Sequence, residues 1–149
     1  MIYKPKLNEY DIPRLIALAN LTTDEFSRND LKKEIVKKVL LHNYPMFFLI
    51  DKFIHSKTIM KEVYADVILI NMKGNDYDIN DVVVNEILIY ASLDSLMYYG
   101  ADSASYEFNK KCKDEFYRRG REFEDKIELQ RKIMLGKKLI RKLYVKKGD

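Results

Sequence analysis

The side chains that could perform covalent or metal chemistry are few in this sequence. Cys112 with His42 or His55 is the candidate nucleophile–base pair, because a thiol needs a nearby base to become a strong nucleophile. Cys112, however, falls at the spacing of an apolar helical stripe, and no neighbouring sequence favours its thiolate. The two histidines also lack cysteine or glutamate at metal-ligand spacing. We therefore predict a protein that is not an enzyme and that holds no metal and no cofactor.

A calcium loop is a second chemistry that residue spacing suggests. Asp76, Asp78 and Asn80 stand at alternate positions, as the first three ligands of such a loop do. That loop also needs glycine at its sixth position and glutamate at its twelfth, where this chain has Asp81 and Ile87. Turn formation and helix capping explain the same residues better.

The strongest functional signal is the positive charge of the C-terminal end. Residues 131–149 contain eight basic residues and one acidic residue, a net charge of +7, so the remaining residues carry 4 − 7 = −3. The basic residues are Arg131, Lys132, Lys137, Lys138, Arg141, Lys142, Lys146 and Lys147, and Leu139, Leu143 and Tyr144 lie among them. This amphipathic pattern fits a segment that binds either nucleic-acid phosphates or a protein groove with an acidic rim.

Length and composition limit the class of protein. A chain of 149 residues that is 47% hydrophobic and 34% charged fits one globular domain. A single cysteine excludes an intrachain disulfide. No apolar run reaches membrane-spanning length and no signal-peptide pattern opens the chain, so we expect no membrane partner.

Helical periodicity dominates, and the predicted fold class is a mainly α helical bundle. Its centre is a long antiparallel helix pair over about residues 80–129 that turns at Gly100. The apolar positions are Val83, Ile87, Ala91 and Leu96 in the first helix, and Phe108, Cys112, Phe116, Gly120, Phe123 and Ile127 in the second. Before this pair we expect a helix capped by Asp11 and a helix that ends at His42, with His42 inward and Lys32 outward.

Residues 58–72 form the one stretch in which β pattern outweighs helix pattern. Val63, Ala65, Val67 and Leu69 alternate with Tyr64, Asp66, Ile68 and Ile70. This predicts a small β strand or hairpin element, which must pair with Met1–Lys6, with a hairpin arm or with a neighbouring subunit.

The order of these features resembles a known family. The apolar run 67–70, an acidic turn, the helix from Asp81, the Tyr98-Tyr99-Gly100 turn and the charged helix 106–126 resemble tailed-bacteriophage head-to-tail adaptor (connector) proteins. The resemblance covers roughly residues 60–130. It implies a structural virion protein that is made in the host cytoplasm and forms a homo-oligomeric ring, usually of twelve copies, at the head–tail junction. The ring would bind the portal protein and tail proteins, and DNA would pass through it.

We therefore expect an adaptor-like domain over residues 1–130 and a basic amphipathic segment over residues 131–149. The basic segment would bind the portal or contact DNA non-specifically. Val67, Leu69, Tyr98 and Tyr99 would contribute to the subunit interface, although tyrosines at a core edge would show the same pattern. The alternative is a small nucleic-acid-binding or regulatory protein that uses the basic helix. A hydrolase or nuclease is the third hypothesis, and no set of catalytic residues in the sequence supports it.

Overall fold

The computed structural model describes the backbone of residues 6–147 and the side chains of residues 6–141. The chain divides into two compact units, Met1–Lys113 and Asp114–Asp149. Within the described residues the secondary structure is helical, apart from one isolated antiparallel bridge between Lys73 and Ser103. The mainly α class is thus confirmed.

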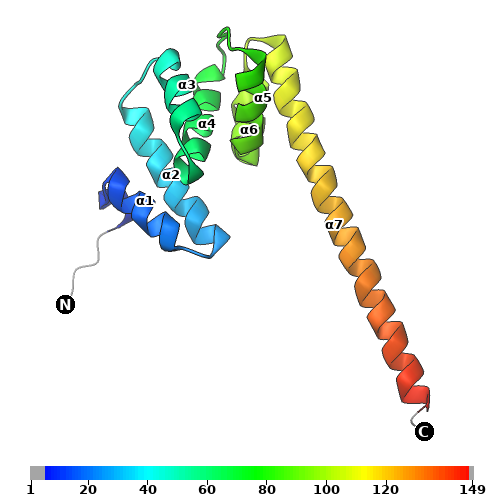
Figure 1. The fold of residues 1–149 in the computed structure, drawn as a ribbon. Helices are drawn as coiled ribbons and strands as arrows, with labels where there is room; N and C mark the ends of the chain where they lie inside the picture. Colours follow the sequence, from blue (N-terminus) through cyan, green and yellow to red (C-terminus); the bar gives the residue numbers. More distant parts are fainter. Residues whose placement is uncertain (1–5, 148–149) are drawn as a thin grey trace, which may run out of the picture. The chain divides into compact units, whose positions relative to one another are not determined.

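The first unit contains six complete α-helices and the first turns of a seventh (Figure 1). They are α1 (Ile12–Leu21), α2 (Glu25–Leu41), α3 (Met46–His55), α4 (Thr58–Met72), α5 (Asp81–Tyr90), α6 (Leu93–Tyr98) and α7 (Tyr106–Lys147), with short 3-10 turns η1 (Leu7–Glu9) and η2 (Gly100–Asp102). Helix α4 is central and contacts α1, α2, α3, α5, α6 and η2. The core of this unit is therefore organised around α4.

The predicted β element is wrong, because residues 58–72 form α4. Nearly every face of this helix is buried, and Val63, Val67, Ile68 and Leu69 are at most 1% exposed. An apolar run that is buried on all sides has no polar face to reveal its helical period. The alternation of residue types in this run therefore predicted a strand where the chain forms a helix. The proposed partner strand Met1–Lys6 lies almost wholly outside the described residues.

The predicted long antiparallel helix pair is also wrong in its first arm. That arm consists of two short helices, α5 and α6, which are separated at Ala91 and Ser92. The Ser92 hydroxyl accepts a hydrogen bond from the Ser95 amide and caps α6. The second arm is longer than predicted, since α7 continues without a break through position 130.

Side-chain caps explain where the two N-terminal helices, α1 and α2, begin. The Asp11 carboxylate accepts a hydrogen bond from the Arg14 amide and starts α1, as predicted. Helix α2 is capped by Asp24, whose carboxylate accepts from the amides of Phe26 and Ser27. Two orientations were predicted wrongly, because His42 is exposed and Lys32 is only 7% exposed.

Candidate functional site

The residues first considered for covalent chemistry do not form a site. Cys112 is fully buried, and this burial raises the pKa of its thiol to about 12, so the thiolate is scarce near neutral pH. His55 is exposed on α3, where its Nδ1 lies 2.8 Å from the Asp51 carbonyl oxygen. His42 stacks on Tyr44 instead of facing the thiol. Among residues with described side chains, no group of three or more His, Cys, Asp or Glu could hold a metal ion.

A partly buried ionic network joins α2 to α4. Arg28 donates two hydrogen bonds to the Glu62 carboxylate. The Lys32 Nζ lies 3.9 Å from an oxygen of Glu62 and 3.9 Å from an oxygen of Asp66. Asp66 is 4% exposed, and its carboxylate also accepts a 2.8 Å hydrogen bond from the Ser92 amide. Burial raises the pKa of Asp66, while Lys32 and the Ser92 amide oppose that rise.

A second buried cation, Lys61, lies in the first turn of α4. The Lys61 Nζ donates a 3.0 Å hydrogen bond to the Phe53 carbonyl and lies 2.9 Å from the Glu86 carboxylate. It also lies 4.3 Å from the centre of the Phe53 ring and 5.3 Å from that of Tyr90. No buried side-chain nitrogen or oxygen among the described residues lacks a hydrogen-bond partner, so these networks fix how α4 packs and leave no buried group for a ligand.

An open hollow of about 300 Å³ lies where the loop before α5 meets the start of α7. We call it the acidic hollow. Its lining residues are Asp76, Tyr77, Asp78, Ile79, Asp81, Val84, Ser105, Glu107, Phe108 and Lys111. Four carboxylates therefore face one ammonium group, that of Lys111, which lies 3.5 Å from Asp81. Apolar side chains form part of the same wall, so the hollow suits a basic side chain with a long aliphatic stem.

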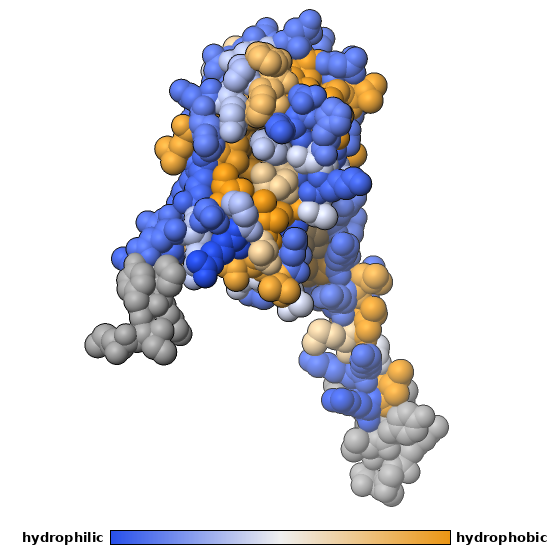
Figure 2. Space-filling model, turned by 60° about the vertical axis from the view of Figure 1, so that its left-hand side comes forward, coloured by the Kyte–Doolittle hydropathy of each residue, from blue (hydrophilic) through white to orange (hydrophobic). Residues whose placement is uncertain are grey.

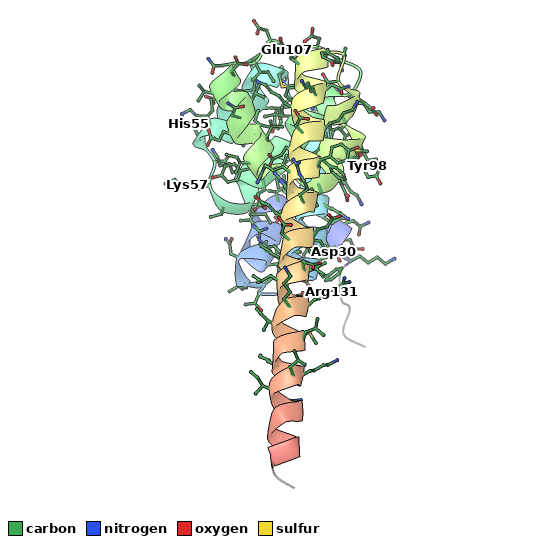
Figure 3. The ribbon with its side chains drawn as sticks, turned by 90° about the vertical axis from the view of Figure 1, so that its right-hand side faces the viewer. Asp30, His55, Lys57, Tyr98, Glu107 and Arg131 are labelled. Carbon is green, nitrogen blue, oxygen red and sulfur yellow. The ribbon has the colours of Figure 1, made fainter. Side chains whose placement is uncertain are left out.

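Exposed apolar side chains lie next to the hollow in sequence, on α5 and α6. We call Val82, Leu93, Met97 and Tyr98 the α5–α6 face; their exposed fractions are 74%, 44%, 39% and 64%. Figure 3 labels Tyr98 on α6 and Glu107 in the first turn of α7. These exposed apolar side chains on two consecutive helices are available to a partner.

The predicted interface residues fall in two environments. Val67 and Leu69 are 1% and 0% exposed and pack inside the first unit. Tyr98 is exposed, and Tyr99 is partly buried with the Lys73 Nζ 5.8 Å from its ring centre. Of these four residues, only the tyrosines reach the surface of the described unit.

Comparison with known proteins assigns no family, since no family model, no curated protein and no solved structure matches this chain.

The second unit consists of the continuation of α7. The predicted partner-binding residues Arg131, Lys132, Lys137, Lys138, Leu139 and Arg141 are all exposed on it. The side chains of Lys142, Leu143, Tyr144, Lys146 and Lys147 lie outside those described. Apolar and polar side chains alternate along this helix in Figure 2, and Phe123, Leu135 and Leu139 are 65%, 60% and 61% exposed. A hollow beside Gly120 is lined by α7 alone and so has a single wall.

Sequence reasoning missed the acidic counterpart of the basic segment. Residues 74–109 contain no lysine, arginine or histidine. They contain Asp76, Asp78, Asp81, Glu86, Asp94, Asp102 and Glu107. The signal was available as a charge count over this window, and the structure adds that four of these residues, Asp76, Asp78, Asp81 and Glu107, line the acidic hollow.

Proposed function

We propose that this protein is a structural adaptor that joins larger neighbours through the exposed surface of α7. The observation that carries the proposal is the second unit itself. It is a helix whose apolar side chains are exposed among basic ones, which is the pattern of a helix that docks into a complementary groove. No helix within the described residues is both long and apolar enough to span a bilayer.

The narrower proposal is a head-to-tail adaptor ring between portal and tail, and its support is the sequence resemblance. The ring would attach to the portal through residues 131–149, where Arg131, Lys137 and Leu139 belong to the exposed surface. Basic side chains would meet an acidic rim, and leucines would enter an apolar groove.

Deletion of residues 131–149 tests this proposal. The shortened chain should keep the helical circular dichroism and thermal unfolding of the first unit but should no longer bind a purified portal protein. Electron microscopy of the full chain with portal should show a ring. Attachment that survives the deletion would contradict the role given to α7, and no attachment by either chain would contradict the portal as partner.

The alternative function is nucleic-acid binding, which the exposed Arg131, Lys132, Lys137, Lys138 and Arg141 favour. A DNA titration at several salt concentrations separates the two functions. Tight binding whose affinity falls steeply with salt supports the alternative, because each phosphate contact releases counterions.

A further inference from the structure

Two surfaces of this chain have opposite charge and share exposed apolar side chains. The window 74–109 carries seven acidic residues and no basic residue. The part of α7 from Lys126 to Arg141 carries Lys126, Arg131, Lys132, Lys137, Lys138 and Arg141 against a single acidic residue, Glu128. Opposite charges on two exposed surfaces steer the surfaces together and fix their relative orientation.

We propose that the basic part of α7, residues 126–141, docks on the α5–α6 face and the acidic hollow of a second copy of this chain. This inference rests on the proposed function and deepens it, because it names the contact through which copies assemble. It assigns Leu135 and Leu139 to the neighbouring copy and leaves the basic side chains on the other sides of α7 for the portal. Leu135 and Leu139 of α7 cover Val82, Leu93, Met97 and Tyr98. Lysine and arginine side chains of the same helix reach Asp76, Asp78 and Asp94.

The chemistry of the hollow matches that of the proposed occupant. Ile79, Val84 and Phe108 line it with apolar surface, and the carboxylates of Asp76, Asp78 and Glu107 stand around them. A lysine or arginine places its aliphatic stem on apolar surface while its charge meets the carboxylates. A wholly acidic or wholly apolar partner would satisfy only half of this lining.

The occupant is a second copy because other arrangements conflict with the chain. Helix α7 is unbroken from Tyr106 to Lys147, and its rise of about 1.5 Å per residue places Lys126 about 30 Å along the helix from Tyr106, so residues 126–141 do not fold back onto the start of the same helix. Pairing of α7 with another α7 would bring like-charged segments together, which opposes association. Docking of α7 on the α5–α6 face of another copy is a contact between different surfaces, and contacts of that kind close into rings or extend into filaments.

Two charge-reversal variants test the contact in the full chain. K137E/K138E makes the basic segment less basic, and D76K/D78K reverses the rim of the hollow; all four side chains are exposed. The wild-type chain should self-associate in sedimentation velocity, and more strongly at low salt than at high salt. Each variant should weaken self-association about tenfold or more, which corresponds to about 1.4 kcal/mol.

Mixing the two variants provides the decisive measurement. In each variant alone, the two substituted side chains meet side chains of the same sign, whereas in the mixture both possible contacts bring opposite charges together at those positions. The mixture should therefore recover association close to that of the wild-type chain. The control K33E/K57E makes the same change in net charge as K137E/K138E at exposed positions outside residues 74–109 and 126–141, and it should associate like the wild type.

A wild-type chain that stays monomeric at all concentrations, or variants that associate normally, would overturn the proposal. So would a mixture that fails to recover association. If the chain is monomeric but binds DNA, and K137E/K138E loses that binding, the basic part of α7 serves nucleic acid instead. Binding of portal by a chain that does not self-associate would leave the proposed function intact and reject only this contact.

Discussion

Replacing Gly100 by alanine tests the packing that holds the start of α7 on the rest of the first unit. An added Cβ would lie 2.4 Å from the Cys112 Sγ and 3.2 Å from both the Cys112 Cβ and a methyl carbon of Leu69. Gly100 does not have a positive φ, so alanine adds no backbone strain there. The effect of G100A is therefore a steric one.

The expected magnitude follows from that overlap. Overpacking a buried site typically costs about 1–3 kcal/mol. Restriction of the unfolded chain by alanine offsets about 0.4–1 kcal/mol of this cost. We expect G100A to lower the free energy of unfolding by about 1–2 kcal/mol, which lowers Tm by about 2–8 °C in a chain of this size.

A double-mutant cycle assigns the loss to one contact. C112A removes the sulfur and by itself should cost about 1 kcal/mol in lost burial. In G100A/C112A the closest overlap is gone, so the double variant should lose less than the sum of the single losses by about 1 kcal/mol. Urea unfolding followed by circular dichroism measures all four free energies.

The matched control is G120A in α7, because a Cβ at Gly120 meets nothing within 4 Å. That substitution should stabilise the helix by about 0.5–1 kcal/mol. The reasoning is refuted if G100A is as stable as the wild type or if the G100A and C112A losses simply add.

Three further predictions concern buried polar groups. D66A should lower the free energy of unfolding by about 3–5 kcal/mol in urea titrations, because it leaves Lys32 with only Glu62 and leaves the Ser92 amide without its acceptor. D66N should lower it by less, since the amide oxygen of asparagine still accepts the hydrogen bond from the Ser92 amide. Folding raises the pKa of Asp66, so the folded state binds the carboxyl proton more tightly than the unfolded state does. The free energy of unfolding of the wild type relative to D66N should therefore fall as pH rises from the unfolded pKa near 3.8 through the folded pKa. Urea unfolding at several pH values would contradict this if that difference stayed constant or grew. Cys112, fully buried and with its thiol pKa raised to about 12, should react with a thiol reagent at neutral pH only as fast as the unit unfolds; rapid labelling of the folded chain would mean that α7 opens locally.

Helix N-terminal caps and amphipathic faces could be predicted from the sequence wherever one side of a helix is exposed to solvent. Asp11 was predicted as the cap of α1, and Ile87, Leu96 and Phe108, which were predicted on apolar helix faces, are buried. Residues 131–149 were predicted to form an exposed basic helix. The backbone is helical through Lys147, and the described basic side chains are exposed.

The failures occur where tertiary packing removed the pattern. In α4 the burial of all faces hid the helical period, and β-branched residues then favoured a strand. Lys32 was placed outward because a single sequence cannot show that Asp66 and Glu62 of α4 would lie 3.9 Å from its Nζ. The break between α5 and α6 was readable, since Ser92 has the type and position of a helix cap, but an apolar stripe that continues across it masked the signal.

The absence of lysine and arginine from residues 74–109 determines how the folded chain responds to trypsin. Trypsin cleaves after these two residues, so α5, α6 and η2 stay within the single fragment 74–110 whatever their local opening. The end of α7 offers many closely spaced cleavage sites by contrast. A brief digestion should therefore shorten the chain from its C-terminal side first, and a contact that covers α7 should be visible as protection of those sites.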